Sequence, residues 1–397
     1  MVPHAGREDY VMLTILHLVS LKGMGGRAAT AIRQVRLLAG RGHRVLLACL
    51  PGSAIATRGR ELGLEVYADF RFSRGFKPFD LWHDCRSLAV RCAANKVDVV
   101  HAHLSQESWV ACIGARLLSR RPIVIRSRGV VVPVVPHIFN RLMHNHYTDH
   151  VVAPSRVIYE HLRSLPGFNS EKVALIPDGV DLLRFSPELS GVSIRHEFGI
   201  SEDTPLVVMV ARLEAVKGHD VFFAALKRLL SKGNAQKFRA LCACDERTPG
   251  AFDRTVANAR ALGLPESFLT MTGFRNDIEK IIAAADVIAL PSLGSEGSSR
   301  VALEAAAAGV PVVGSSVGCL PEVIENGVTG IIVPPRNSEA MAEAIQSLIE
   351  NPERARQMGV AARARAEKLY DEQVMVEKLE ALYILEVERN RGKGLIL

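Results

Sequence analysis

Residues 291–315 read PSLGSEGSSRVALEAAAAGVPVVGS and contain the pattern that decides the fold. A buried strand ends where this stretch begins, and a loop of small residues follows it. Ser298 or Ser299 is suited to accept a backbone N–H there and cap a helix. The helix is expected over about residues 300–308, because Gly309 and a following proline stop it. An apolar run then starts the next strand, so the stretch predicts a strand, loop, helix, turn and strand.

Two carboxylates occupy unusual places in this stretch. Glu296 lies in the small-residue loop, and Glu304 lies inside the otherwise apolar helix, where no protein partner for it can be named from the sequence. A buried carboxylate costs free energy unless it is hydrogen-bonded. Both can border one cleft at the helix N-terminus, which attracts anions. A ligand with hydroxyls and a phosphate fits this pattern, although a loop residue and a solvated helix face would explain either glutamate alone.

Strands and helices alternate along the rest of the chain. This order predicts a parallel, doubly wound sheet in each half. Because the chain has 397 residues, it is expected to form two domains. The predicted strands of the first half are 13–19, 43–50, 64–68, 98–102, 122–125 and 151–153, the last of them. Those of the second half are 206–210, 238–244, 268–271, 286–290, 312–315 and 330–333.

Composition narrows the class of protein. Hydrophobic residues make up 48% and charged residues 23%, as in globular proteins, and no segment is long and apolar enough to span a bilayer. Residues 11–21 are interpreted as a buried strand rather than a signal peptide. The seven cysteines are scattered, which favours reduced thiols in the cytoplasm. Only Cys242 and Cys244 are close in sequence, and no second Cys or His pair lies nearby to complete a metal site.

The net charge of +7 indicates an anionic partner. Phosphorylated substrates and an anionic membrane surface are both compatible with it. Nucleic acid is the least favoured, since no basic motif with interleaved aromatic residues is present and aromatic residues are only 6%.

Two groups of residues at expected strand ends could contact phosphates. Gly23, Gly25 and Gly26 follow the first strand and precede a helix, which is where nucleotide-binding folds place a glycine loop. Their spacing is not G-x-G-x-x-G, so a dinucleotide cofactor is not expected. Arg212 and Lys217 follow the first strand of the second half, and two cations there suit a diphosphate, although two surface cations would give the same pattern.

Several of these motifs together resemble the retaining GT-B glycosyltransferases of glycosyltransferase family four. The matching segments are E-x7-E from Glu296 to Glu304 with the following G-x-P-V-V, R-x4-K-G from Arg212, and the hinge P-D-G-V-D from Pro177. The resemblance covers nearly the whole chain and is densest over residues 206–335. It implies two Rossmann-like domains that face a central cleft, with a C-terminal helix that crosses back to the first domain.

The resemblance also implies a role for each domain. Residues 1–186 would bind the acceptor, residues 187–370 the nucleotide sugar, and residues 371–397 would be the returning helix. Arg212, Lys217 and Glu296 would be catalytic. The donor would be held by further residues of the motifs, namely Gly25, Gly26, Gly273, Phe274, Gly297, Ser298, Ser299 and Glu304.

Histidines and arginines in the first half are candidates for contact with the acceptor. His101 and His103 lie at the end of the fourth strand, and a metal site there has no third ligand at a suitable spacing. His103 is therefore expected to touch the acceptor or the donor sugar. Arg126 and Arg128 suggest an acidic acceptor, and Arg128 stands where many family members have histidine. No D-x-D motif is present, so no metal ligand and no cofactor are expected.

The function predicted from these observations is metal-independent, retaining transfer of a sugar from a UDP-, GDP- or ADP-linked donor. The acceptor would be a saccharide or a lipid-linked molecule in envelope polysaccharide or lipopolysaccharide assembly. The protein would be cytoplasmic, with peripheral attachment to the inner face of the membrane. A nucleotide-sugar epimerase, a phosphorylase and a non-catalytic sugar-binding protein are the alternatives on the same fold.

Overall fold

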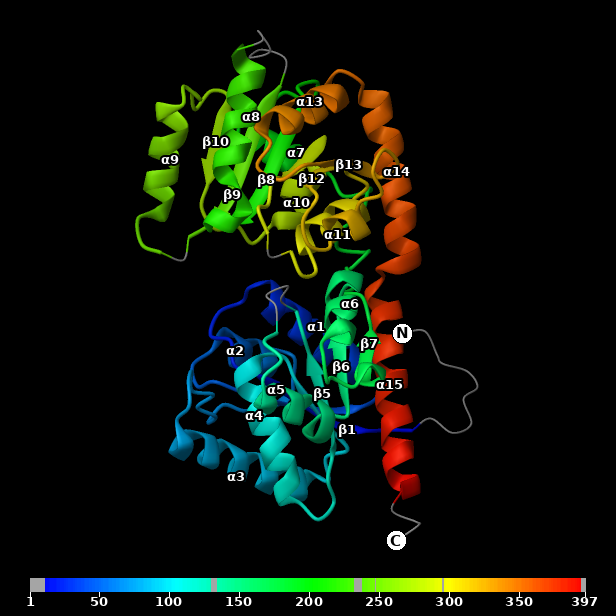
Figure 1. Cartoon of the computed structure of the whole chain (residues 1–397). Helices are drawn as coiled ribbons and strands as arrows, with labels where there is room; N and C mark the ends of the chain where they lie inside the picture. Colours follow the sequence, from blue (N-terminus) through cyan, green and yellow to red (C-terminus); the bar gives the residue numbers. More distant parts are fainter. Residues whose placement is uncertain (1–10, 130–133, 232–237, 247, 295, 394–397) are drawn as a thin grey trace. The chain divides into compact units, whose positions relative to one another are not determined.

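The computed structural model describes residues 11–129, 134–231, 238–246, 248–294 and 296–393. Its contacts divide the chain into two compact units (Figure 1). Unit 1 consists of Met1–Asp178 and Gln373–Leu397, and unit 2 consists of Gly179–Glu372. Ser295, in the loop of the opening motif, lies outside the described residues.

Unit 1 contains a seven-stranded parallel sheet in the order β3-β2-β1-β4-β5-β6-β7. The prediction that strands of the first half end at residue 153 is wrong, because β7 adds a further edge strand beside β6. Strand β7 is only three residues long, which is too short to show an alternation of apolar and polar residues in the sequence. The strands are β1 (Thr14–Val19), β2 (Arg44–Cys49), β3 (Glu65–Tyr67), β4 (Val99–Ala102), β5 (Ile123–Ser127), β6 (His150–Ala153) and β7 (Val173–Leu175).

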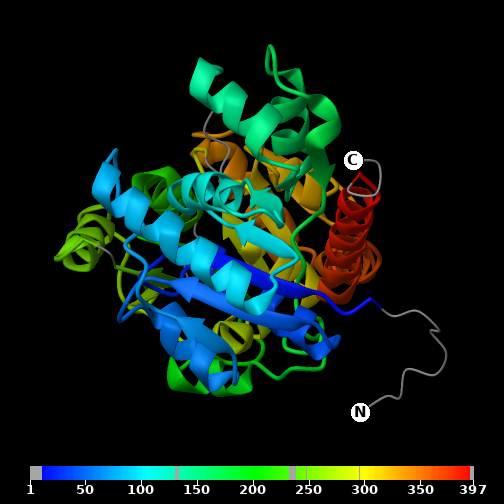
Figure 2. The ribbon, with the colours of Figure 1, turned by 90° about the horizontal axis from the view of Figure 1, so that it is seen from below.

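Helices cover both faces of this sheet (Figure 2). Side chains of β1 alternate between the faces, so that Leu16 and Leu18 pack with α3 and α4, whereas Ile15 packs with α1 and α15. Both faces of the strands are therefore apolar, as a parallel sheet requires. The helices are α1 (Gly26–Gly40), α2 (Ala54–Glu61), α3 (Pro78–Asn95), α4 (Ser105–Gly114), α5 (Ile138–Leu142), α6 (Arg156–Ser164) and α15 (Glu372–Lys393).

Helix α15 returns from the end of the chain to unit 1, as the sequence predicts. Its buried Val376, Leu379 and Tyr383 join the same apolar cluster as strand β1. Glu380 of α15 accepts hydrogen bonds from Arg41 at 2.8 Å and contacts His43 at 2.7 Å. Apolar burial and a partly buried ion pair thus attach this helix to the first sheet.

The hydroxyl of Tyr383 is hydrogen-bonded to Nδ1 of His101, and burial raises the pKa of Tyr383 well above its usual value. Tyr383→Phe is expected to lower the free energy of unfolding by about 1–3 kcal/mol, because a buried ring nitrogen loses its partner. Tyr159→Phe is the matched control, since the Tyr159 hydroxyl contacts the exposed Arg163. Urea unfolding of both variants measures the difference, and equal stability would show that the Tyr383 hydroxyl does not anchor α15.

Unit 2 contains a six-stranded parallel sheet in the order β10-β9-β8-β11-β12-β13. The strands are β8 (Leu206–Arg212), β9 (Arg239–Asp245), β10 (Leu269–Thr272), β11 (Val287–Leu290), β12 (Val312–Ser315) and β13 (Gly330–Val333). Its helices are α7 (Val192–Glu197), α8 (His219–Ser231), α9 (Ala251–Ala261), α10 (Ile278–Ala283), α11 (Arg300–Ala307), α12 (Leu320–Val323), α13 (Ser338–Ile349) and α14 (Pro352–Leu369).

The two faces of the second sheet are also both covered. Leu206 and Val208 of β8 pack in one cluster with residues of α10 and α11, and Val207 and Met209 pack in another with residues of α8 and α13. The predicted fold class, two doubly wound α/β domains, is thus confirmed. Within the described ranges, no helix is long and apolar enough to cross a membrane.

Candidate active site

The strand order of unit 2 reverses between β8 and β11. Both strands are parallel and adjacent, so the loops after their carboxyl ends lie at the same edge of the sheet. Ligands of open α/β sheets bind at such a reversal point. Lys217 lies in the 3₁₀ turn Ala215–Lys217 after β8, and Glu296 lies in the loop after β11.

Lys217 and Glu296 are in direct contact at this edge. Nζ of Lys217 donates to Oε1 of Glu296 at 2.6 Å, and Oγ of Ser292 donates to the same oxygen at 2.5 Å. Glu296 is buried, whereas part of Lys217 is exposed. The sequence predicts that both residues contact the donor, but the sequence does not reveal that they bind each other. The pair thus places the positively charged ammonium group of Lys217 next to the carboxylate of Glu296, which accepts hydrogen bonds.

Two glycines allow these loops to approach so closely. Gly218 has φ of 74°, and a Cβ there would lie 2.0 Å from the carbonyl oxygen of Pro291. Gly318 has φ of 54°, and a Cβ there would lie 2.1 Å from the carbonyl oxygen of Glu296. Any larger residue at either position would displace the loop that carries Glu296. Gly318 is a part of the site that the sequence analysis missed.

Helix α11 begins directly after this loop. The prediction that Ser298 or Ser299 caps it is wrong: Ser299 is at the N-cap position with φ of 31°, and its side chain makes no capping bond. A left-handed conformation of a residue other than glycine is strained, and such strain is concentrated at functional sites. Gly297, Ser298 and Ser299 all lie in the turn before α11, as the sequence predicts.

Glu304 is buried on α11, and it does have a protein partner. Arg300, one helical turn earlier, donates to Oε1 of Glu304 at 2.6 Å. The spacing of four residues is the usual one for an ion pair on a helix, so this contact could have been read from the sequence. Any ligand of Glu304 would share the carboxylate with Arg300.

The remaining donor candidates of unit 2 are more widely spread. Arg212 ends β8 and forms an ion pair with Glu214, and both side chains are partly exposed. Gly273 and Phe274 follow the edge strand β10, which β9 separates from β8, and Phe274 is exposed. The structure therefore brings Lys217 and Glu296 into contact, but it does not bring Arg212 into that ion pair.

Unit 1 has its own reversal point between β1 and β4. Gly25 is the N-cap residue of α1 and Gly26 its first residue, so the glycine loop lies at the end of β1 as predicted. His103 follows β4 and contacts Nδ1 of His17 through its Nε2 at 2.9 Å. Burial lowers the pKa of His103 to about 3 and that of His17 well below its usual value, so both rings are neutral at pH 7.

Two buried groups of side chains have the composition of metal sites. His17, His101 and His103 have ligand atoms within 4.8 Å of one another, but both ring nitrogens of His101 already contact protein hydroxyls, those of Tyr383 and Ser127. The second group joins Cys242 and Cys244, whose sulfurs are 3.2 Å apart, to His219, which is distant in sequence but has a ligand atom within 4.8 Å of both sulfurs. Those two sulfurs form a hydrogen-bonded thiol pair. That no residue binds a metal stays a prediction.

Arginines are gathered beside this edge of unit 1. Arg126 of β5 pairs in register with Ala102, the residue before His103. Burial lowers the pKa of Arg126 and of Arg128, and the charges of Arg126 and Arg27 lower that of Arg128 further. Three nearby guanidinium groups favour an anionic ligand.

Glu107 is a buried acid that the sequence analysis missed. It lies in the first turn of α4, where the backbone N–H of Ser20 donates to its Oε1 at 3.2 Å. Among the described residues its Oε2 has no hydrogen-bond partner. Burial raises the pKa of Glu107 to about 7. The only sequence signal was a carboxylate just after the fourth strand.

Glu107 should make the stability of the protein depend on pH. Between its usual pKa of 4.5 and about 7 the unfolded chain ionises while the folded protein keeps its proton, so the free energy of unfolding falls as pH rises. The full loss is roughly 3 kcal/mol. Glu107→Gln is expected to remove this dependence, and Glu61→Gln, at an exposed position, should keep it. Urea unfolding from pH 4 to 8 measures this, and parallel curves for the wild type and Glu107→Gln would contradict it.

Comparisons with known proteins point to one family. A sequence profile described as glycosyl transferases group 1 matches residues 193–365, and one described as glycosyltransferase family 4 matches residues 24–184. A D-inositol 3-phosphate glycosyltransferase of Segniliparus rotundus is 32% identical over 223 residues, which cover 55% of this chain and 48% of that protein. The chain thus spans about half the length of this curated relative.

Solved structures resemble the chain over nearly its whole length. A glycosyltransferase from Rickettsia africae has a TM-score of 0.86 at 23% identity and covers 96% of this chain and 100% of its own. Anabaena HepE, solved in complex with UDP and glucose, has a TM-score of 0.79 at 21% identity and covers 93% and 99%. At these identities the likeness shows the fold alone.

Proposed function

Because this chain belongs to the glycosyl transferases group 1, within glycosyltransferase family 4, we propose that it is a retaining transferase that uses a nucleotide-sugar donor. The fold is of the GT-B class, as the sequence predicts. The donor would bind unit 2 and the acceptor unit 1. The observation that carries the proposal is the contact between Lys217 and Glu296 at the reversal point of the second sheet.

Lys217 and Glu296 suit the two halves of a nucleotide sugar. A cation stabilises the charge that develops on the diphosphate as it departs, and a carboxylate accepts hydrogen bonds from sugar hydroxyls. In the proposed complex, Lys217 would bind the diphosphate and Glu296 the sugar. These contacts would replace the one that the two side chains now make with each other. Ser292, which also donates to Glu296, would keep this carboxylate in place.

The proposed reaction is attack on the same face of the sugar. The bond between the anomeric carbon and the diphosphate oxygen breaks, and its electron pair stays on the diphosphate. The acceptor oxygen forms the new bond to that carbon, and its proton passes to the leaving phosphate. Lys217 and Arg212 stabilise the departing charge, while Glu304 would hold the ribose hydroxyls.

We further propose that the acceptor is anionic, as a phosphorylated or carboxylated sugar would be. The gathered charges of Arg27, Arg126 and Arg128 support this class, because a guanidinium binds phosphate and carboxylate with two parallel hydrogen bonds. A curated relative is named for inositol 3-phosphate, itself a phosphate ester. Attachment to a lipid and a role in envelope assembly fit the same charge.

The proposed function is tested by incubating the protein with UDP-, GDP- and ADP-linked sugars and phosphorylated or lipid-linked acceptors. Proton NMR follows the anomeric signals of donor and product. Retention gives a product with the anomeric configuration of the donor. Binding of donor without any turnover would favour the non-catalytic sugar-binding alternative, and an inverted product would overturn the retaining mechanism.

Transfer is expected to need no divalent ion, because Lys217 and Arg212 supply positive charge to the diphosphate and the sequence lacks a D-x-D motif. Treatment with EDTA should change the transfer rate by less than about twofold, well below the 10²-fold loss typical of a missing electrostatic stabiliser. Initial rates before and after treatment measure this. Loss of activity that Mg²⁺ or Mn²⁺ restores would contradict it.

A further inference from the structure

Helix α3 of unit 1 exposes an apolar strip to solvent. Phe79, Trp82 and Val90 are 86%, 57% and 60% exposed, and Phe76 just before the helix is 85% exposed. Phe79, Trp82, Arg86 and Val90 follow one another at spacings of three or four residues, so they share one face of the helix. Large apolar side chains grouped in this way on a surface mark an interaction site.

The opposite face of α3 is already used for packing. Cys85, Leu88 and Cys92 are buried in the cluster that covers the first sheet. The helix is therefore apolar on both sides, whereas a helix at the surface of a globular protein is polar on its outer side. The stability of unit 1 does not explain the outer strip, because its side chains are not buried.

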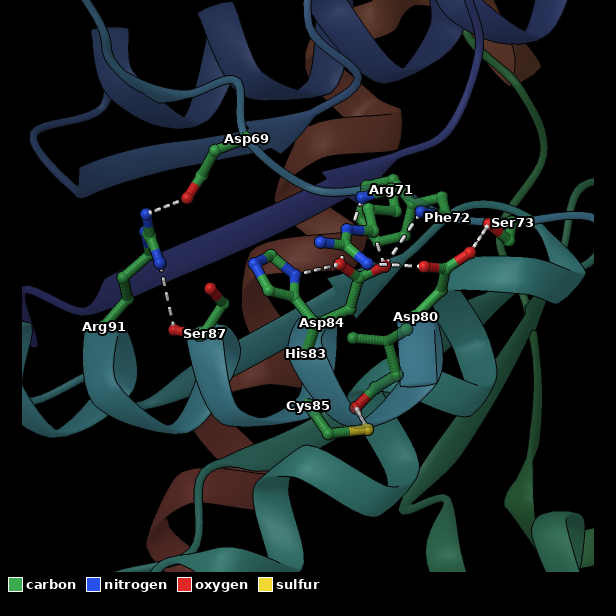
Figure 3. A network of polar contacts seen from close by, with 11 residues as sticks. Asp69, Arg71, Phe72, Ser73, Asp80, His83, Asp84, Cys85, Ser87 and Arg91 are labelled. Carbon is green, nitrogen blue, oxygen red and sulfur yellow. Dashed lines mark hydrogen bonds and ion pairs between the residues drawn. The ribbon is translucent and has the colours of Figure 1, made fainter. Parts of the chain in front are cut away.

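A polar network holds the segment before α3 in place (Figure 3). The buried carboxylate of Asp84 accepts hydrogen bonds from the backbone N–H groups of Arg71 and Phe72 at 2.8–3.2 Å. Asp80 accepts from the side chains of Arg71 and Ser73, both at 2.6 Å. This segment leads to Phe76. The network therefore ties the chain just before Phe76 to the N-terminal part of α3.

The charge around the strip is positive. Arg74, Lys77 and Arg86 are exposed. The acids of α3 do not offset them, because Asp80 is paired with Arg71 and Asp84 is buried. Aromatic side chains next to lysine and arginine are the combination that lies at the interface of an anionic membrane.

We propose that α3, with the segment before it, binds the surface of an anionic lipid bilayer through Phe76, Phe79 and Trp82. The rings would enter the headgroup region, while Arg74, Lys77 and Arg86 would contact lipid phosphates. The inference rests on the proposed function, since it would hold unit 1, which would bind the acceptor, at a membrane that carries lipid-linked acceptors. The net charge of +7 indicates only that the chain as a whole is attracted to anionic membranes. The proposal names the residues that would make the contact.

Sedimentation with vesicles tests this surface in the full-length protein. The wild type is expected to bind vesicles of phosphatidylcholine with 30% phosphatidylglycerol at low salt, and to bind pure phosphatidylcholine much more weakly. The variant Phe76→Ser, Phe79→Ser, Trp82→Ser should lose at least about tenfold in partition coefficient, because it lacks the three exposed rings that would enter the headgroup region. The variant Arg74→Glu, Lys77→Glu should lose the preference for phosphatidylglycerol, because its charge is reversed.

The control is Val360→Ser, which removes an apolar side chain of unit 2 that is 62% exposed. It should bind vesicles as the wild type does. Equal binding by the triple serine variant and the wild type, or no binding of the wild type to anionic vesicles, would overturn the proposal. So would dimerisation of the wild type, measured by analytical ultracentrifugation, that the triple variant abolishes, because the strip would then be a contact between two copies.

Release of nucleoside diphosphate from the donor in solution, with water or a soluble acceptor taking the sugar, separates this proposal from the proposed function. The triple serine variant should release it at the wild-type rate, because the strip lies outside the proposed donor site. Normal release together with unaltered vesicle binding would overturn only the membrane surface. Absence of release in the wild type with every donor would overturn the proposed function on which the inference rests.

Discussion

Lys217→Ala is expected to slow sugar transfer by about 10²-fold or more, the usual loss when one electrostatic stabiliser of a transition state is removed. Lys217 donates to Glu296 at the reversal point of the second sheet, so its charge lies where the diphosphate would depart. The effect should appear mainly in kcat, because the diphosphate carries more charge in the transition state than in the bound donor. Initial rates at saturating donor measure it.

Lys227→Ala is the matched control for this substitution. Lys227 lies on the neighbouring helix α8 and is exposed, so its removal should leave the rate unchanged. Thermal unfolding of both variants separates lost catalysis from lost folding. Near-normal turnover of a folded Lys217→Ala variant would remove Lys217 from the mechanism.

Glu304→Gln is expected to weaken the binding of nucleoside diphosphate by about tenfold to a hundredfold. The substitution keeps the shape and one acceptor oxygen but removes the charge, and charge-assisted hydrogen bonds contribute roughly 1.5–3 kcal/mol. Glu296→Gln should change the affinity for the bare diphosphate by less than about threefold, which is below 1 kcal/mol, while slowing transfer, because it would face the sugar. Calorimetric titration of each variant with the nucleoside diphosphate compares the two carboxylates.

The ion pair of Glu304 calls for a further control. Arg300 donates to Glu304, so Glu304→Gln could act by releasing Arg300 rather than by losing ribose contacts. Arg300→Met leaves Glu304 charged and removes the pair. If the ribose assignment is right, Arg300→Met should bind the diphosphate more tightly than Glu304→Gln does. Equal losses at Glu296 and Glu304, or no loss at Glu304, would show that the assignment of the two carboxylates is wrong.

Much of the fold could be predicted because buried parallel strands are continuous apolar runs between turn residues. The strand that the sequence analysis did not predict in unit 1 is β7. It is only three residues long and pairs with a neighbour on one side only. Short edge strands are defined by their neighbour, here β6, rather than by their own sequence. Helix α11 ends at Ala307, within a residue of the predicted end, because Gly309 adopts φ of 71° and stops it.

Candidate residues for the site could be named from the sequence, but most of the contacts between them could not. The contact between Lys217 and Glu296 depends on how β8 and β11 pair, and a single sequence does not specify that pairing. Gly318 touches the loop of Glu296 from a third segment for the same reason. In contrast, the pair of Arg300 and Glu304 is local. The rule for residues four apart on a helix would have predicted it, so the expectation that Glu304 has no partner that the sequence can name is wrong.

The central claim is that unit 2 activates a nucleotide-sugar donor through Lys217 and Arg212. Release of nucleoside diphosphate from UDP-, GDP- and ADP-linked sugars, with water or a soluble acceptor taking the sugar, tests it most directly. It is measured for the wild type, Lys217→Ala, Arg212→Ala and Lys227→Ala. The account predicts release from at least one donor by the wild type and Lys227→Ala, and a rate about 10²-fold lower in the other two. Equal release by all four proteins, or no release from any donor by the wild type, would contradict it.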